Sequence, residues 1–367
     1  MPSILVVTIV HDPEDSRIRH RQIPALLADG WQVTYAAPFA AYDRPGPLLP
    51  GLRTVDLPRA VGRDRVPAGK AARALIAAEA PRHDLVLVHD PELLAAVTGL
   101  GLANLVWDVH EDPAAALVAK DWLPRPLRGL IGWGWRRAER VAERSHRLLL
   151  AEYAYQERFE RPHPVVPNTV LVPDLVPPPG TARVVYLGTV TMARGAREMV
   201  EVARLLAAAT DAACRVEVIG AARDEESARL LEAASGQDLL TWHGFQPASV
   251  ALDLLPGAVA GLSLLHDLPN YRHSRPTKII EYFAHGVPVI TTPLPVAVEL
   301  VESAGAGLVV PFRDPDAAAA AIVELRADPD RAARLGAAGH AAAKAAYDWG
   351  SAGAEFTATL RGFLREG

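Results

Sequence analysis

Short apolar runs alternate with longer stretches of helical periodicity along most of the 367-residue chain. A short apolar run bounded by turn residues is typical of a buried strand, whereas apolar positions three and four apart indicate an amphipathic helix. Because the two patterns take turns, the sequence predicts βαβ units, which build parallel sheets covered by helices.

The first half contains the clearest alternation. The strand pattern falls on Ser3–Thr8, Gln32–Ala37, Asp84–His89, Asn104–Val109, Arg147–Leu150 and Pro164–Val166. The helical pattern falls on Ile18–Ala28, Ala68–Ala80, Pro91–Leu100, Leu127–Arg144 and Ala154–Phe159. Pro24 lies inside the first of these helices and has no N–H to donate, so it should kink the helix or displace its start.

A proline-rich segment interrupts this alternation. Leu171–Gly180 contains four prolines in ten residues and has no periodicity, which is typical of a stiff interdomain linker. We therefore expect a first domain over residues 1–170, a linker over residues 171–182 and a second domain over residues 183–346.

The alternation restarts after the expected linker. Strands are predicted at Arg183–Leu187, Arg215–Ile219, Leu239–Trp242, Val259–Leu264, Pro288–Thr291 and Gly307–Val310. Helices are predicted at Ala196–Ala208, Glu225–Ala234, Thr277–Ala284, Val296–Val301, Asp316–Leu325, Asp328–Ala346 and Ala352–Leu364. The expected fold class is α/β, with two tandem Rossmann-like domains. Open parallel sheets present ligands at the carboxyl ends of their strands, so we expect a ligand cleft between the domains.

Composition narrows the class of protein. Apolar residues make up 50% of the chain and charged residues 22%, as in ordinary globular proteins. The net charge of −5 gives no reason to expect a nucleic-acid partner. The single cysteine, Cys214, favours a reducing compartment, and the apolar N-terminus has no basic leader, so we expect a cytoplasmic protein. The most apolar internal stretch, Leu254–Leu265, is too short to span a membrane.

The segment from Ser274 to Ile290 carries the most chemistry. Pro276 suits the start of a helix, and Gly286 suits its end. Lys278 lies in the first turn of this helix, where the helix N-terminus and the cation together favour an anion. Glu281, one turn later, can accept hydrogen bonds from sugar hydroxyls. From spacing alone, a surface pair of Lys278 and Glu281 explains the pattern equally well.

This segment resembles the donor-binding signature of retaining glycosyltransferase family four, in the branch that reads Pro-x-Lys-φ-φ-Glu-Tyr-φ-Ala-x-Gly-φ-Pro-Val, where φ is apolar. The resemblance extends to Leu5–Tyr35, His89–Leu94, Asp108–Glu111, and Val185–Gly188 with the following Arg194-Gly195. It implies GT-B architecture, a final helix within residues 347–367 that crosses back onto the first domain, and transfer of a sugar from a nucleotide diphosphate donor. It also implies retention of configuration. We expect no cofactor besides the nucleotide-sugar substrate.

The resemblance implies roles for individual residues. Glu281 would hold the ribose of the donor, and His110 would lie at the reacting centre. The residues implied to bind the donor diphosphate are Arg194, Lys278, Arg275 and Thr277, and those implied to face the donor sugar are His273 and Ser274. The residues implied on the acceptor side are His11, Asp12, Asp15 and Arg17.

Two positions depart from the family pattern. His273 stands where the common pattern has its first glutamate, and Thr189 stands where the family has an arginine directly after Gly188. A departing diphosphate still needs cations. Lys278 or Arg275 would therefore have to replace the missing arginine.

Two other functions remain open. A nucleotide-sugar 2-epimerase has the same architecture without a separate acceptor. A non-catalytic, transferase-like subunit would also account for His273 and Thr189. For the transferase, we expect an acceptor from polysaccharide, glycolipid or natural-product glycoside biosynthesis.

The acidic and histidine residues do not predict a metal site. The pairs His89-Asp90 and His266-Asp267 and the run His110–Asp112 lack the i,i+4 histidine spacing of a helical zinc site. We therefore expect no structural or catalytic metal.

The sugar-transfer interpretation does not explain one basic segment, residues 120–147. Residues 120–147 contain Lys120 and seven arginines against three acidic residues, together with Trp122, Trp133 and Trp135. A basic, tryptophan-bearing helix suits an anionic membrane surface or a lipid-phosphate acceptor, which would make the protein peripheral at the inner face of the membrane. Alternatively, the arginines pair with Glu139 and Glu143, and the tryptophans enter the core.

Overall fold

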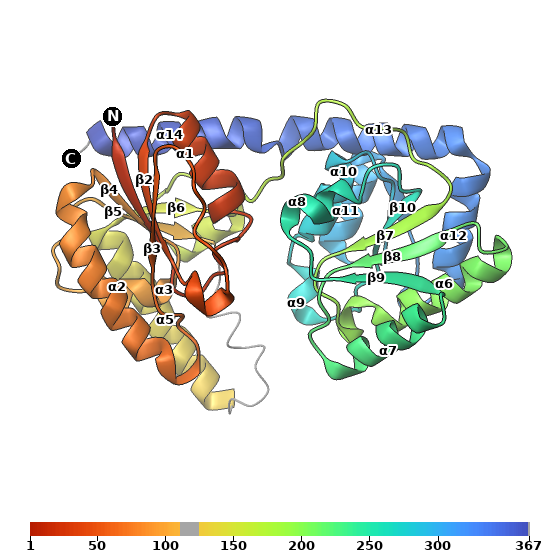
Figure 1. Cartoon of the computed structure of the whole chain (residues 1–367), viewed down its shortest axis with the longest axis horizontal. Helices are drawn as coiled ribbons and strands as arrows, with labels where there is room; N and C mark the ends of the chain where they lie inside the picture. The colour runs from red at the N-terminus through yellow and green to blue at the C-terminus, as the bar shows by residue number, and fades with distance from the viewer. Residues whose placement is uncertain (111–124, 366–367) are drawn as a thin grey trace. The chain divides into compact units, whose positions relative to one another are not determined.

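The computed structural model describes residues 1–110 and 125–365 and contains two compact units (Figure 1). The first unit comprises Met1–Asn168 and Gly350–Gly367, and the second comprises Thr169–Trp349. Each unit contains a parallel, six-stranded sheet. The predicted α/β class with two Rossmann-like domains is therefore confirmed. Within the described residues, no helix is both long enough and apolar enough to cross a membrane.

The sheet of the first unit has the strand order β3-β2-β1-β4-β5-β6. Its strands are β1 (Ser3–Val7), β2 (Gln32–Ala37), β3 (Leu52–Asp56), β4 (Leu85–Val88), β5 (Leu105–Val109) and β6 (Arg147–Leu150). Apolar side chains of one face, among them Leu5, Val86 and Trp107, pack with α2 (Arg65–Glu79), α3 (Pro91–Val97) and α5 (Arg125–Ser145). The strand order reverses between β1 and β4, and such sheets present ligands at the carboxyl ends of these strands.

The first and last helices belong to this same unit. The predicted helix Ile18–Ala28 is helical from Ile18, because the π-helix Ile18–Gln22 leads directly into α1 (Ile23–Ala28). Pro24 lies in the first turn of α1, so the helix start is not displaced and the helix changes type just before the proline. The final helix, α14 (Trp349–Arg365), returns to this unit as expected. Its Arg361 donates to the carboxylate and to the carbonyl oxygen of Asp29, each at 2.7 Å.

Three segments of the first unit differ from the prediction. The strand β3 was not predicted, because an edge strand carrying Arg53 and Asp56 has little apolar signal. The predicted strand Pro164–Val166 is a single bridge between Leu150 and Val165, since nearby prolines cannot donate to a ladder. The predicted helix Ala154–Phe159 is a 3-10 helix over Tyr153–Arg158.

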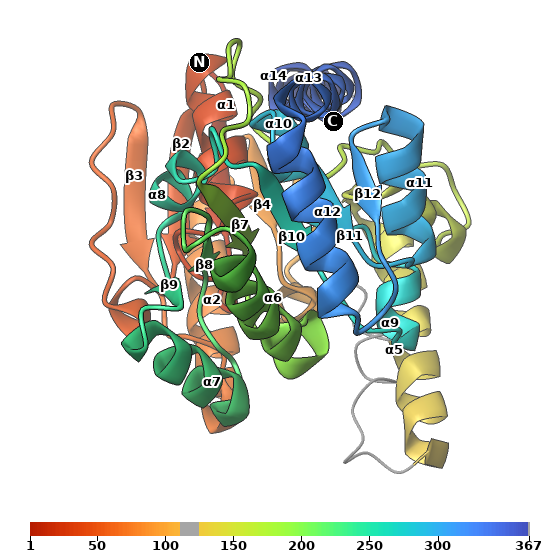
Figure 2. The same ribbon diagram turned by 90° about the vertical axis from the view of Figure 1, so that its right-hand side faces the viewer.

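The sheet of the second unit has the order β12-β11-β10-β7-β8-β9. Its strands are β7 (Arg183–Leu187), β8 (Arg215–Ile219), β9 (Leu240–Gly244), β10 (Ala260–Ser263), β11 (Val289–Thr291) and β12 (Gly307–Val309). One face packs with α6 (Ala196–Ala209), α7 (Glu225–Gly236) and α12 (Pro315–Ala327), and Figure 2 shows α6 beside α12. The other face packs with α8 (Ala248–Asp253), α10 (Thr277–Ala284), α11 (Pro295–Ala304) and α13 (Pro329–Ala346). The short helices α8 and α9 (Pro269–Arg272) were not predicted.

The proline-rich segment belongs to the second unit and is bonded to its other elements. The ammonium group of Lys344 in α13 donates to the Asp174 carboxylate at 2.8 Å, and the Nε2 atom of His340 donates to the carbonyl oxygen of Pro173 at 2.7 Å. The Gly180 N–H donates to the carbonyl oxygen of Gly257 at 3.0 Å. This segment is therefore fixed to the second unit at several points along its length.

Candidate functional site

The amino group of Lys278 is buried at the carboxyl end of β7, in the second sheet. Lys278, in the first turn of α10, is only 9% exposed, and its Nζ atom has no hydrogen-bond partner among the described residues. The Nζ atom lies 3.7 Å from the centroid of the Tyr186 ring, on β7. Burial, together with the charge of Arg194, lowers the pKa of Lys278 well below its usual value. An anion bound beside this group would stabilise its charged form, so the arrangement suits an anionic ligand.

The helix that carries Lys278 is held firmly against the sheet. The Tyr282 hydroxyl accepts from the Leu187 N–H at 2.8 Å and donates to the carbonyl oxygen of Leu262 at 3.1 Å, which ties α10 to β7 and β10. Gly286 ends the helix at φ +68°, as the sequence predicted, in a conformation that favours glycine. Lys278 therefore reaches the end of β7 from a rigid element.

Glycines let the backbone approach closely around this cation. A Cβ atom added at Gly220 would lie 2.0 Å from the carbonyl oxygen of Gly188, and one added at Gly195 would lie 2.6 Å from that of Leu264. Gly188 itself has φ +111°, and a Cβ atom there would lie 3.9 Å from the Cε atom of Lys278. The loop after β7 thus brings its backbone next to the buried ammonium group.

Arg194 belongs to the same loop. It ends a 3-10 turn, Met192–Arg194, and its backbone N–H donates to the side chain of Thr191. Its guanidinium donates to the carbonyl oxygen of Thr189 at 3.4 Å. The His266 N–H donates to the carbonyl oxygen of Ala193 at 2.9 Å, which fixes the turn to the segment after β10. Of the residues expected to bind the diphosphate, Arg194 and Lys278 lie close enough for the Arg194 charge to lower the pKa of Lys278.

The remaining donor-side residues lie along the same segment. Glu281 is buried one turn after Lys278, whereas Thr277 is exposed at the start of α10. His273 and Ser274 are exposed in the turn between α9 and α10. The guanidinium carbon of Arg275 lies 5.8 Å from the centre of the Tyr347 ring.

A small hollow of about 200 Å³ opens beside Gly188. Its walls come from the residues that follow β7, β8 and β9, among them Thr189, Ala221, Phe245 and Gln246. The Phe245 side chain is 57% exposed, so an aromatic ring is accessible there. The hollow is of a size to take one planar ring system rather than a whole dinucleotide.

In the first unit, a buried ion pair organises the carboxyl end of the sheet. Asp108, at the end of β5, is fully buried and accepts from the Nε and Nη2 atoms of Arg17, each at 2.8 Å, and from the Gln22 amide at 2.7 Å. Although burial opposes its ionisation, the Arg17 charge and hydrogen bonds hold the pKa of Asp108 well below its usual range. Arg17 also donates to Asn168 and to the carbonyl oxygen of Val166, each at 3.0 Å. Arg17 therefore positions Asp108 from inside the core.

Three histidines surround this ion pair. The Nδ1 atom of His89 lies 3.2 Å from Asp108, and the ring of His110 lies 4.7 Å from that of His11 and 5.4 Å from that of His89. The Nε2 atoms of His110 and His11 are 2.9 Å apart. Burial lowers the pKa of His110 to about 3, so this ring is neutral at physiological pH.

The loop after β1 is fixed by a second buried carboxylate. Asp90 accepts from the Thr8 hydroxyl at 3.0 Å and from the backbone N–H groups of Ile9 and Val10, and its carboxylate lies 3.3 Å from the Nε2 atom of His11. Burial raises the pKa of Asp90. No local sequence pattern predicts these contacts, because Asp90 and the residues bonded to it are about eighty positions apart.

The other residues expected on the acceptor side shape the same loop. Asp15 accepts from the backbone N–H groups of Arg17 and Ile18 at 2.9 and 3.0 Å. Asp12 accepts from the Glu14 N–H at 2.9 Å. Although burial opposes its ionisation, the neighbouring His11 and the hydrogen bond from the Ile18 N–H lower the pKa of Asp15. Glu111 and Asp112 lie outside the described residues.

His89, Asp108 and His110 also have the spacing of a metal-binding group, because one ligand atom of each lies within 4.8 Å of the others. However, both oxygens of Asp108 already accept hydrogen bonds from Arg17, whose guanidinium is itself buried. A divalent ion placed there would lie next to this fixed positive charge. The arrangement therefore suits a hydrogen-bond network better than a metal ion.

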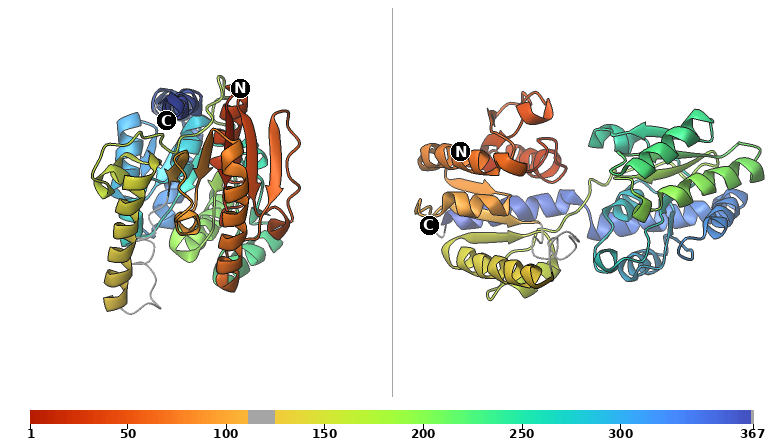
Figure 3. Two further views of the ribbon diagram at one scale, coloured as in Figure 1. Left: turned by 90° about the vertical axis from the view of Figure 1, so that its left-hand side faces the viewer. Right: turned by 90° about the horizontal axis from the view of Figure 1, so that it is seen from below.

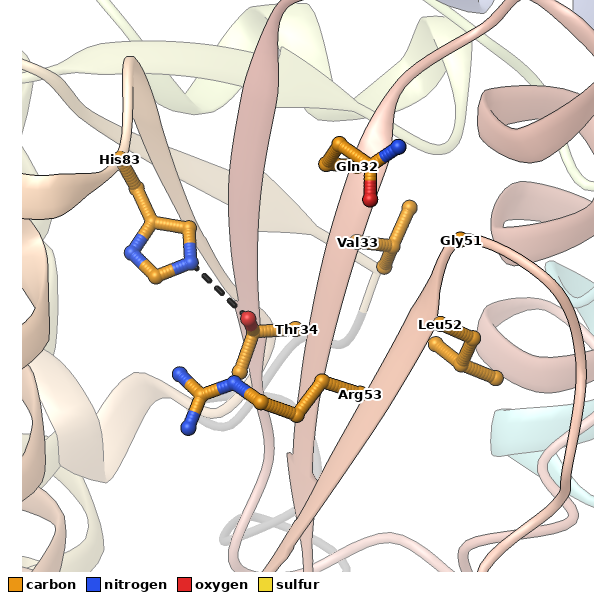
Figure 4. A pocket seen from close by; sticks show the side chains of 7 residues that line it. All are labelled: Gln32, Val33, Thr34, Gly51, Leu52, Arg53 and His83. Atoms are coloured by element: carbon orange, nitrogen blue, oxygen red, sulfur yellow. Dashed lines mark hydrogen bonds between the residues drawn. The ribbon is translucent and has the colours of Figure 1, made fainter.

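Another hollow, of about 310 Å³, lies in the first unit (Figure 4). The Nε2 atom of His83 lies 2.9 Å from the Thr34 hydroxyl oxygen, within hydrogen-bond distance, and Arg53 also lines this hollow. These residues stand at or near the amino ends of β2, β3 and β4. Since open parallel sheets present ligands at the opposite ends of their strands, we do not assign this hollow to the functional site.

Residues 181–328 match the model of a family described as Glycosyl transferases group 1. No curated protein has a sequence that matches this chain.

Three solved structures resemble it in fold. Sucrose-phosphate synthase from Thermosynechococcus elongatus has 18% sequence identity and a TM-score of 0.72, with 100% of each chain covered. Anabaena HepE in complex with UDP-glucose has 13% identity and a TM-score of 0.66, covering 98% of this chain and 99% of the other. A glycosyltransferase from Rickettsia africae has 13% identity and a TM-score of 0.67, covering 100% and 99%. The two units therefore have the GT-B fold.

Proposed function

We propose that this protein is a glycosyltransferase that moves a sugar from a nucleoside diphosphate donor to an acceptor hydroxyl, with retention of configuration. The observation that carries the proposal is the buried Lys278, whose Nζ atom has no hydrogen-bond partner among the described residues. A buried cation in the first turn of a helix, beside a loop that begins and ends with glycine, suits a diphosphate. The match of residues 181–328 to group 1 glycosyl transferases supports the same ligand.

The second unit would bind the donor. Lys278 and Arg194 would stabilise the charge that develops on the departing diphosphate, and as fixed cations they would take the place of a metal ion. The carboxylate of Glu281 would bind the ribose hydroxyls, and the hollow beside Phe245 would hold the base. UDP is the first nucleotide to test, because the HepE structure contains UDP-glucose.

The first unit would supply the reacting centre. His110 ends β5 and has a neutral ring, so it can exchange hydrogen bonds with a sugar without adding a charge. Arg17 and Asp108 would position it, and His11 would lie beside the acceptor. Retention of configuration is proposed from the resemblance of the Pro276–Val289 segment to retaining enzymes. We place the reaction in the cytoplasm, in line with the lone, buried Cys214.

Product analysis tests this function. The purified protein is incubated with UDP-sugars, alone and with candidate polysaccharide, glycolipid and natural-product acceptors, and the products are identified by NMR. The proposal predicts an acceptor glycoside with the anomeric configuration of the donor. A changed donor sugar without acceptor would instead identify a 2-epimerase, and an inverted product would contradict retention. Donor binding without turnover on any acceptor would indicate a non-catalytic subunit.

A further inference from the structure

The exposed side of α5 combines basic and apolar side chains in adjoining stripes. Trp133, Arg137, Arg140 and Arg144 recur every three or four residues, so they share one side of the helix, and all are exposed. Val141 and Ala138, also exposed, lie on the adjoining side. Figure 3 shows α5, coloured yellow, along the flank of the first unit. Lys120, Asp121 and Trp122 lie outside the described residues.

The acidic residues of α5 do not neutralise most of these arginines. Glu139 is buried and binds Arg136 and Arg158. Glu143 is buried and accepts from the N–H groups of Glu160 and Arg161 and from the His163 ring. Arg144 has an exposed partner, Glu160, at 3.6 Å. Among the described residues, Arg137 and Arg140 have no ion pair, so their charges remain available to an outside anion.

The tryptophans of the described helix do not both enter the core. The Trp133 side chain is 64% exposed, and Val141 is 55% exposed. Trp135 lines a groove of about 960 Å³ between α3 and α5, with the apolar residues Leu94, Val97, Ala138 and Ala142. Glu92, an acidic residue at the groove, is paired with Arg65 at 2.5 Å. The groove is therefore apolar inside, and its edge on α5 carries unneutralised arginine.

We propose that this α5 surface, made of Trp133, Arg137, Arg140, Val141 and the groove beside them, binds an anionic phospholipid bilayer. The arginines would meet the phosphate headgroups, Trp133 would enter the interfacial region, and the groove would receive part of an acyl chain. A small soluble anion would need the arginines but not the exposed tryptophan or the apolar groove. The proposal does not depend on the sugar-transfer function.

Co-sedimentation of the full chain with vesicles tests the proposal. Wild-type protein should bind phosphatidylglycerol vesicles, should bind phosphatidylcholine vesicles much less, and should detach as salt rises. The double variant Arg137→Glu/Arg140→Glu should lose binding on the order of tenfold or more. Trp133→Ala should weaken binding several-fold and leave its salt dependence in place.

A matched control carries the same change of charge elsewhere. Arg229→Glu/Arg334→Glu alters two exposed helical arginines of the second unit and should keep wild-type binding. Circular dichroism should show that all variants are folded. Absent or charge-independent vesicle binding, or an equal loss in the control variant, would overturn the proposal. So would a concentration-dependent dimer that Trp133→Ala abolishes, because the surface would then bind a second copy of the chain.

Discussion

The Nε2 atoms of His110 and His11 lie 2.9 Å apart, so one ring must donate a hydrogen bond to the other. The Nδ1 atom of His110 lies 3.3 Å from the carbonyl oxygen of Asp108, which can only accept. His110 therefore carries its proton on Nδ1, and its Nε2 atom accepts from His11. A neutral ring whose second nitrogen accepts a hydrogen bond from a side chain can offer that nitrogen to a sugar hydroxyl instead.

Replacing His110 by alanine should lower kcat and kcat/KM by similar factors, on the order of 10²–10⁴, because the residue would act on the transition state. The dissociation constant of the donor should change little. Steady-state kinetics and calorimetry measure the two quantities. His340→Ala, which removes a histidine bonded to Pro173, is the control. Turnover of a folded His110→Ala protein within threefold of wild type would be incompatible with this role.

Burial of His110 should make stability fall as pH is lowered. The pKa is about 3 in the folded protein and ~6.5 in an unfolded chain. Between these values the unfolded state binds more protons, so acid favours unfolding, and the contribution is absent above ~6.5. The slope of the free energy of unfolding against pH should therefore be smaller in His110→Asn than in wild type. Urea unfolding from about pH 6.5 to pH 4 measures both slopes, and equal slopes would refute the shift.

Glu281→Ala should weaken binding of the nucleotide sugar by ~1–3 kcal/mol, through the loss of charged hydrogen bonds to the ribose. Isothermal titration with the donor measures this change. Glu302→Ala, which alters an exposed glutamate of the neighbouring helix α11, should leave the affinity unchanged. An unaltered affinity in Glu281→Ala would remove this residue from the site.

Removal of metal ions should leave activity intact, because Lys278 and Arg194 supply fixed positive charge for the leaving group. Activity is measured before and after dialysis against excess EDTA. If activity disappears and returns with magnesium or manganese, the leaving group is stabilised by a metal ion. The group formed by His89, Asp108 and His110 would then be the first place to look.

The sequence predicted regular elements better than it predicted contacts. Strands such as Arg183–Leu187 and the helix Thr277–Ala284 were correctly bounded, because a continuous apolar run or a helical period is a local signal. The edge strand β3 lacks that signal. The ion pair of Arg17 and Asp108 joins residues 91 positions apart, so no local pattern reveals it.

The sequence also did not predict which charged groups are buried. Spacing placed Lys278 at a helix start but could not distinguish a surface pair from a buried cation, because the burial comes from Tyr186 on another element. Trp133 shows the reverse case. Its type suggests a core residue, whereas the structure exposes it on α5.

The most direct test of the proposed donor site is the binding of nucleoside diphosphates to wild-type protein and to Lys278→Met. Methionine keeps the length and apolar stem of lysine but removes its charge. Titration calorimetry with UDP, ADP and GDP should show binding of at least one nucleotide to the wild type. Lys278→Met should bind that nucleotide about tenfold more weakly or worse, since charged hydrogen bonds contribute ~1.5–3 kcal/mol. Equal affinity in the two proteins, or no binding of any of these nucleotides to the wild type, would contradict the account.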